Sequence, residues 1–204
     1  MWLCNLISFS INSYICFISL PAPVILVPNS AHCRLSLSSN LTTVRISEDS
    51  LQVPPNPERF DASAVVLGSE GFNSGSHSWD IKVGESTDWA VGVMAESALR
   101  KGNISSRTGL WRFWYYNGEY LAGSISGVPE LLTVTQKPQR IRVQLDWDAG
   151  KVSFSDPEND LLLHTLTHTF TERVFPLINV TCKVSPLKIV PLKTSVTVES
   201  LNQA

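Results

Sequence analysis

Two histidines and four cysteines are the residues of this chain whose chemistry invites a metal or redox role. His164 and His168 are four positions apart, the spacing of two metal ligands on one helix face. However, the stretch around them is rich in Leu and Thr and favours a strand, where that spacing does not define a metal site. The cysteines show no Cys-x-x-Cys spacing, so neither zinc nor a disulfide framework is predicted. They are Cys4, Cys16, Cys33 and Cys182.

Catalytic patterns are weak in this sequence. Asp146 and Asp148 offer two nearby carboxylates, but they fall at the end of a strand pattern and in the following turn, where capping or solvation is the expected role. There is no Gly-x-Ser-x-Gly and no His-Glu-x-x-His. We therefore expect no enzyme, no cofactor and no metal. A catalytic function is the weakest hypothesis, and turnover abolished by one point change in a cleft would revive it.

A glycine-rich stretch from Gly68 to Gly75 invites a phosphate-binding interpretation, which the residues after it do not support. Phosphate loops present backbone amides at the start of a helix. Here the glycines lead into a strict alternation, with Trp79, Ile81 and Val83 on one face of a strand. The same stretch places His77 before that strand, where it either lines a pocket or hydrogen-bonds within the loop. We expect a turn that leads into a half-buried strand.

Composition limits the class of protein. The chain has 204 residues, of which 43% are hydrophobic and 17% are charged, enough for one domain with a buried core. The net charge of −2 and the absence of a basic run argue against nucleic acid as a partner. Residues 1–20 are apolar and uncharged, and Pro21 and Pro23 follow them. One interpretation of these residues is a signal or membrane anchor, and a membrane contact is expected only in that case. The other, which we favour, is an alternative or artefactual start of the chain.

From Val24 onward, short strand patterns separated by turns run to the end of the chain, and no segment keeps a period of 3.6 residues. Residues 140–147 alternate four polar with four apolar side chains. A turn at 148–150 and renewed alternation to Phe154 predict a hairpin. Strands are also expected at 89–93, 174–178 and 187–190. These features predict one all-β domain, a two-sheet antiparallel β-sandwich with little helix.

Three of these strands carry motifs that resemble the PRY-SPRY domain of tripartite-motif proteins and butyrophilins. The motifs stand as Leu26-Val27-Pro28, Trp79-Asp80-Ile81-Lys82 and Leu145-Asp146-Trp147-Asp148, with family-like segments between them at 56–61, 66–72 and 89–93. The resemblance implies a PRY-SPRY domain at 24–195, with PRY at about 24–77 and SPRY at about 78–193. It leaves residues 1–23 as a leader and 196–204 as a tail.

The segment from Gly109 to Gly118 is the sharpest candidate for a binding site. On a strand, Arg112, Trp114 and Tyr116 share the face opposite the core, and these residue types are enriched in binding hot spots. The alternative is that they pack against a neighbouring loop, with the Arg112 stem across the rings. By resemblance, the strand and its neighbouring loops form a surface for a protein ligand. Its frame comprises Ser86, Thr87, Asp88 and the loops Ser97–Thr108 and Ser124–Glu130.

Two functions follow from the resemblance. The first is the substrate-recognition end of a tripartite-motif-type ubiquitin ligase in the cytoplasm, with innate immunity as the expected process. The second is a butyrophilin-type intracellular domain that senses a ligand. No Cys/His cluster for a RING or B-box is present in the sequence, so we expect no ligase chemistry within this chain. The sequence upstream of this chain distinguishes the two functions. A RING and a coiled coil there favour the ligase, and an immunoglobulin ectodomain with a transmembrane helix favours the butyrophilin-type domain.

Overall fold

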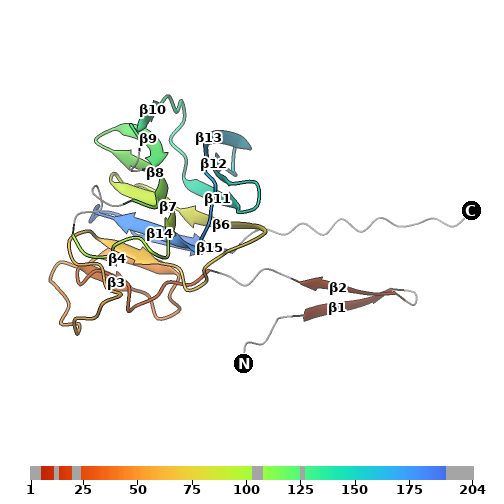
Figure 1. Ribbon diagram of the computed structural model, residues 1–204, viewed down its shortest axis with the longest axis horizontal. Coiled ribbons are helices and arrows are strands. Elements are labelled where there is room, and N and C mark those ends of the chain that lie inside the picture. The colour runs from red at the N-terminus through yellow and green to blue at the C-terminus, as the bar shows by residue number, and fades with distance from the viewer. Residues whose placement is uncertain (1–5, 12–13, 20–23, 103–107, 125–126, 192–204) are drawn as a thin grey trace, which may run out of the picture.

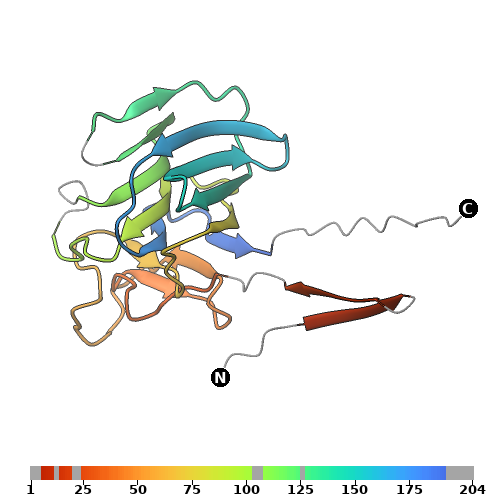
Figure 2. The same cartoon turned by 45° about the vertical axis from the view of Figure 1, so that its right-hand side comes forward.

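The computed structural model describes residues 6–11, 14–19, 24–102, 108–124 and 127–191, with side chains from residue 24 onward. The described elements are fifteen strands, and all strand pairs are antiparallel. Two large sheets lie face to face (Figures 1 and 2). The predicted all-β sandwich is confirmed.

One sheet has six strands in the order β10-β9-β8-β7-β14-β5. The central strands β8, β7 and β14 are seven residues each, and the edge strands β10 and β5 are three. The bounds are β5 Val65–Leu67, β7 Trp89–Ala95, β8 Leu110–Tyr116, β9 Glu119–Ser124, β10 Glu130–Leu132 and β14 Val174–Val180.

The other sheet has seven strands in the order β13-β12-β11-β6-β15-β4-β3. Its strands β11 and β15 alternate buried and less buried residues, which is the pattern of a sheet with one solvated face, and β6 departs from this pattern at the buried Asp80. The bounds are β3 Leu35–Leu37, β4 Thr43–Ile46, β6 Ser76–Lys82, β11 Arg140–Asp146, β12 Lys151–Asp156, β13 Leu161–Thr167 and β15 Leu187–Val190.

The predicted hairpin corresponds to β11 and β12, which pair from Arg142↔Ser155 to Asp146↔Lys151. Gly150 closes its turn with a φ of 64°, in the left-handed region that favours glycine. A Cβ at this position would lie 2.0 Å from the carbonyl oxygen of His168. The glycine therefore meets two requirements of the turn, the backbone angle and the close approach of another segment.

The core lies between the two sheets. Phe113 on β8 stacks against Phe154 on β12, with ring centroids 5.6 Å apart, and both side chains are fully buried. Trp79, which the sequence predicts as a core residue, is 3% exposed. Buried aromatic side chains such as these supply a large share of the hydrophobic stabilisation, because each ring removes a large apolar area from water.

The segment before β5 extends this core to the outer side of the six-stranded sheet. Leu110, Met94 and Leu177 are on the outer face of that sheet by their register, yet all three are fully buried. They belong to the same buried cluster as Leu26 and Phe60, which precede β5. The outer face is therefore covered over β7 and β14, and its open part is formed by β8, β9 and β10.

Strands β1 Leu6–Ile11 and β2 Tyr14–Ser19 pair in a separate two-stranded sheet. The rest of residues 1–23, like the expected tail at 196–204, lies outside the described residues. In the part of the chain that the structure describes, no helix has the length and apolar character needed to cross a membrane. The two interpretations of residues 1–20 stay predictions.

Candidate partner-binding surface

Strand β8 separates core residues from outward residues as its alternation predicts. Trp111 and Phe113 are buried, and Tyr115 packs against the same core. Arg112 and Trp114 are half-buried on the opposite face, and Tyr116 is 59% exposed. The structure thus brings the three predicted side chains together on the open part of the six-stranded sheet, whereas their role in binding stays a prediction.

Arg112 and Trp114 form one packed unit. The guanidinium carbon of Arg112 lies over the Trp114 ring, 4.4 Å from its centroid, which is a cation–π geometry. Burial lowers the pKa of Arg112 from its ordinary value, because a charged guanidinium loses hydration there. Arg112 thus lies across the Trp114 ring, which is one part of the packing alternative, whereas the choice between packing and binding stays a prediction. A planar cation held over an indole also offers a partner a flat, oriented donor group.

Glycine at position 92 makes this packing possible. Gly92 on β7 is directly opposite Arg112 on β8, and a Cβ there would lie 2.0 Å from the Trp111 carbonyl oxygen and 2.8 Å from the Arg112 Cα. Any larger residue would displace β8. The position of Arg112 thus depends on a residue of the neighbouring strand that carries no side chain.

An apolar row runs across three strands beside this unit. Trp114 pairs with Leu121 on β9, and Leu121 pairs with Leu131 on the edge strand β10. Leu131 is 62% exposed. Neither leucine is among the residues predicted from the sequence, because each looks like an ordinary strand residue until the register aligns it with Trp114. The two leucines extend the candidate surface by two strand spacings.

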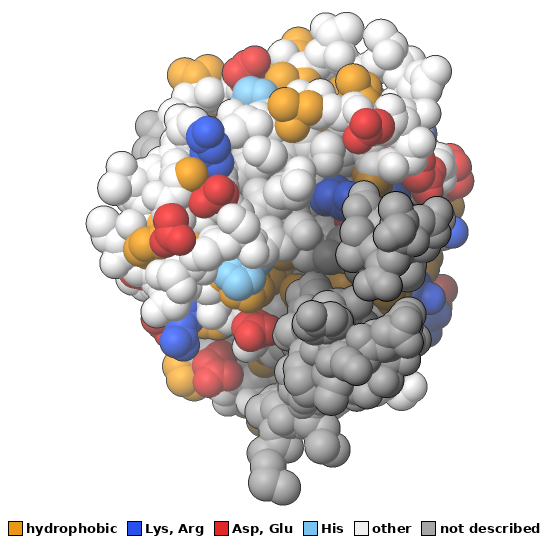
Figure 3. All heavy atoms as spheres, turned by 90° about the vertical axis from the view of Figure 1, so that its right-hand side faces the viewer, with side chains coloured by type: hydrophobic (Ala, Val, Ile, Leu, Met, Phe, Trp, Pro, Cys, Tyr) orange, Lys and Arg blue, Asp and Glu red, His pale blue; other side chains and the backbone are white. Residues whose placement is uncertain are grey.

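Hydrophobic side chains also gather at the upper end of the face drawn in Figure 3, the end where Figure 1 places β10 and β13. Leu161 and Leu162 on β13 are 44% and 62% exposed. His164 Nε2 on β13 lies 3.9 Å from Glu130 Oε2 on β10, so the edge strands of the two sheets meet here. Leu131 follows Glu130 directly and so points to the other face of β10, which leaves the leucines of β13 outside the apolar row.

The rim residues before β7 do not all face solvent. Ser86 is 0% exposed, so its side chain is not available to a partner, and this corrects the expectation that it lies on the rim. Thr87 is exposed, and its hydroxyl donates to Cys182 Sγ over 3.3 Å. Burial raises the pKa of Cys182, but hydrogen bonds, first from the amide and hydroxyl of Thr87 and then from the amide of Val184, together outweigh it and lower the pKa to about 6. Asp88 is half-buried, and its carbonyl oxygen accepts from the amides of Thr181 and Cys182.

The two predicted framing loops are only partly described. At the start of Ser97–Thr108, the Ser97 hydroxyl donates to Glu172 Oε1 over 2.6 Å, and Lys101 Nζ donates to the Arg59 carbonyl oxygen over 2.6 Å. Residues 103–107 of the first loop and 125–126 of the second lie outside the described residues. Their contribution to binding stays a prediction.

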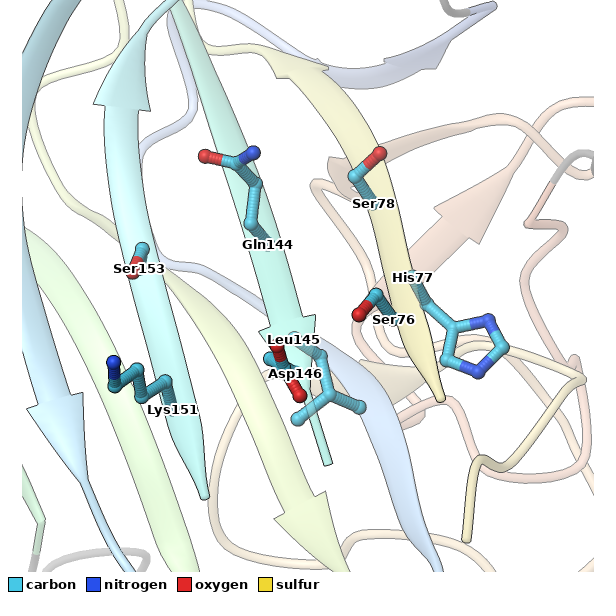
Figure 4. A pocket seen from close by; sticks show the side chains of 8 residues that line it. All are labelled: Ser76, His77, Ser78, Gln144, Leu145, Asp146, Lys151 and Ser153. Atoms are coloured by element: carbon cyan, nitrogen blue, oxygen red, sulfur yellow. The ribbon is translucent and has the colours of Figure 1, made fainter. Parts of the chain in front are cut away.

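A shallow depression of about 300 Å³ lies on the outer face of the seven-stranded sheet (Figure 4). Its lining is polar, with Ser78, Gln144 and Ser153 pointing outward from β6, β11 and β12. His77, which also lines it, turns away: its ring stacks on Phe72 at 3.8 Å, and Nε2 donates to the Ser74 carbonyl oxygen over 2.8 Å. The interpretation of His77 as a loop hydrogen-bonding residue is confirmed.

The carboxylate pair has the predicted turn-capping geometry. Asp146 Oδ1 accepts from the amide of Ala149 over 2.9 Å, within the turn between β11 and β12. Asp148 Oδ2 accepts from the amide of Gly75 over 2.9 Å and so joins this turn to the glycine-rich loop. Each carboxylate thus stabilises a backbone turn.

Comparison with known families identifies the fold. Residues 24–72 match the SPRY-associated domain, PRY, and residues 76–190 match the SPRY domain, which alone covers more than half of the chain. The chain belongs to the PRY-SPRY family. Its six- and seven-stranded sheets superpose on the PSpry domain of TRIM65 with a TM-score of 0.74 at 19% identity, covering 84% of this chain and 90% of that one.

Similar PRY-SPRY sequences occur in longer proteins. The chain is 40% identical over 159 residues to nuclear factor 7, ovary, of Xenopus laevis, and 39% identical over 168 residues to the E3 ubiquitin-protein ligase TRIM58 of Mus musculus. It is also 40% identical over 145 residues to butyrophilin subfamily 1 member A1 of Mus musculus. These matches cover 77%, 81% and 70% of this chain but only 26%, 34% and 27% of the relatives' lengths.

Proposed function

We propose that this PRY-SPRY domain recognises a protein ligand through the outer face of β8, β9 and β10, and that no catalysis occurs in the chain itself. The observation that carries the proposal is the Arg112–Trp114 unit beside an exposed Tyr116. Arg, Trp and Tyr are the residues most enriched in binding hot spots. Together with Leu121 and Leu131 they form a mixed apolar and cationic surface, which suits a protein ligand with an apolar anchor next to an acceptor group.

The proposed setting is the substrate-recognition end of a tripartite-motif-type ubiquitin ligase in the cytoplasm, with innate immunity as the process. Similarity to the ligase TRIM58 supports the ligase setting. Cys33 and Cys182 are free thiols, which fits a reducing compartment. A butyrophilin-type ligand-sensing domain is the second candidate, supported by 40% identity to the butyrophilin. The domains encoded upstream in the same transcript distinguish the two.

The test is a quantitative comparison of partner capture by the wild-type chain and by Trp114→Ala, with capture measured by mass spectrometry. We expect specific partners to fall by at least tenfold with Trp114→Ala, because truncation of a hot-spot residue costs about 2 kcal/mol or more. Leu162→Ala is the matched control, an exposed apolar residue on the other sheet, and it should retain capture. Full capture by a folded Trp114→Ala variant would exclude this surface.

A further inference from the structure

The outer face of the seven-stranded sheet carries a row of like charges. Arg140 on β11 is directly opposite Lys82 on β6, and Lys82 is directly opposite Lys188 on β15. These three strands are hydrogen-bonded neighbours in the middle of the sheet (Figure 1). Like charges that face each other across neighbouring strands destabilise a sheet. The row thus lowers the stability of the fold locally. This suggests that its role is to bind another molecule.

Nearby carboxylates neutralise this row only at Arg140, and only through long ion pairs. Asp80 is fully buried, and Arg142 occupies both of its oxygens, at 2.7 and 3.0 Å. Arg140 lies 3.7 Å from Asp80 and 3.7 Å from Glu158, outside hydrogen-bonding distance of both. Lys82 and Lys188 are exposed. The carboxylates Asp80 and Glu158 are therefore engaged by Arg140 and Arg142, and the two lysines have no ion pair with any described residue.

One donor of the row is buried without an acceptor. Arg140 Nε has no hydrogen-bond partner among the described residues, although its side chain is only 20% exposed. An unsatisfied buried donor is costly, and more so when it is charged. The Asp80–Arg142 pair beneath it holds the neighbouring guanidinium in a fixed bidentate geometry. An oxyanion placed above Arg140 and Lys82 would not reach this buried nitrogen, but it would relieve the repulsion between the two cations.

We propose that the row Arg140–Lys82–Lys188 is a second binding surface, which takes an acidic segment of a partner protein laid across the strands. With strands about 4.8 Å apart, the row spans about 10 Å. Alternate side chains of an extended peptide are about 7 Å apart, so two or three oxyanions of such a segment reach all three cations. Carboxylates and phosphorylated side chains share this chemistry. The surface lies on the opposite sheet from Trp114 and does not depend on the function proposed for that residue.

The surroundings of the row favour an acidic peptide over nucleic acid. The outward residues of β6, β11 and β15 include Ser78, Gln144 and Val190, and none is aromatic. Single-stranded nucleic acids bind strongly where bases stack on aromatic rings along a longer cationic groove. A short cationic row on a polar sheet offers neither feature.

The test measures binding of labelled peptides by fluorescence anisotropy at low salt and at 150 mM NaCl. The probes are a peptide with three glutamates at alternate positions, the same peptide with phosphoserines, a glutamine version, and an oligouridine of equal charge. We expect both acidic peptides to bind and to weaken with salt, because exposed charge pairs are screened. Tighter binding of the phosphoserine peptide identifies phosphorylated partners, and equal binding identifies carboxylates.

The variants are K82E/K188E and, as the matched control, K151E, a charge reversal of an exposed lysine at the other end of the same face. We expect K82E/K188E to lose at least about tenfold in affinity and K151E to stay within about twofold. K82E/K188E should unfold at about the wild-type temperature, because the reversal keeps one like-charge pair between positions 82 and 188 and gives Arg140 an opposite charge across the strands. Trp114→Ala should retain peptide binding, which separates this proposal from the preceding one.

Three results would overturn the proposal. The first is equal binding of the glutamine and glutamate peptides, and the second is an equal loss of affinity in K151E and K82E/K188E. The third is tighter binding of the oligouridine than of either acidic peptide.

Discussion

At the residue scale, one buried tyrosine makes the free energy of unfolding depend on pH. Tyr120 on β9 is 8% exposed, and its ring packs 4.5 Å from that of Tyr115. Burial, with a smaller contribution from Tyr115, raises the pKa of Tyr120 to about 12. An unfolded tyrosine ionises near pH 10. Between these values the unfolded chain loses a proton that the folded chain keeps, so the free energy of unfolding falls as the pH rises.

We therefore predict that Tyr120→Phe loses less stability than the wild type between pH 9 and 11. The difference should be about 1 kcal/mol at pH 11. Urea unfolding followed by tryptophan fluorescence at each pH measures it. Tyr116→Phe, at a position that is 59% exposed, is the control and should keep the wild-type pH dependence. Identical pH profiles for all three proteins would contradict the assignment to Tyr120.

At the scale of the element, strand β8 has one face in the core and an opposite face that we propose for recognition. Phe113 is fully buried and packs against Trp89, Tyr120 and Phe154. Tyr116, three residues later, is largely exposed on the other face. Since neighbouring side chains of a strand point in opposite directions, single substitutions on β8 can address one face at a time.

Phe113→Ala should lower the free energy of unfolding by about 3–5 kcal/mol, because it removes a core ring and leaves a cavity. Tyr116→Ala should change it by no more than about 0.5 kcal/mol. Chemical denaturation of both variants measures the difference. A loss for Tyr116→Ala as large as that for Phe113→Ala would show that the outer face of β8 is also required for folding.

At the scale of the whole molecule, the two matched regions form one folding unit. The buried cluster includes Val24, Leu26 and Phe60 from the first region together with Met94 and Leu177 from the second. Strand β5, which precedes the second region, pairs with β14 inside it. Neither region therefore has a complete core of its own.

From this shared core we predict that a fragment of residues 76–190 does not unfold cooperatively, whereas residues 24–192 do. Without β5 and the segment before it, the outer face of β7 and β14 would expose Met94 and Leu177 to water. Thermal unfolding followed by near-ultraviolet circular dichroism distinguishes the two fragments. A cooperative transition in the shorter fragment at the midpoint of the longer one would refute a shared core.

The sequence by itself determined the fold class, the hairpin of β11 and β12, and the outward face of β8. Each follows from a local rule: a period of two residues for a strand, a glycine for a left-handed turn, and the turn chemistry of Asp146 and Asp148. Local rules need no knowledge of which strand lies next to which. The motifs of the PRY-SPRY family added the family to which this fold belongs.

Which residues reach the surface, and which of them lie side by side there, follows only from the tertiary structure. Ser86 looks exposed in sequence and is fully buried, because residues 181–182 pack against its loop. Leu121 and Leu131 join Trp114, and Arg140 joins Lys82 and Lys188, only through the registers of strands far apart in the chain. Register depends on the pairing of whole strands, and a shift of one residue would move each of these side chains to the other face of its sheet.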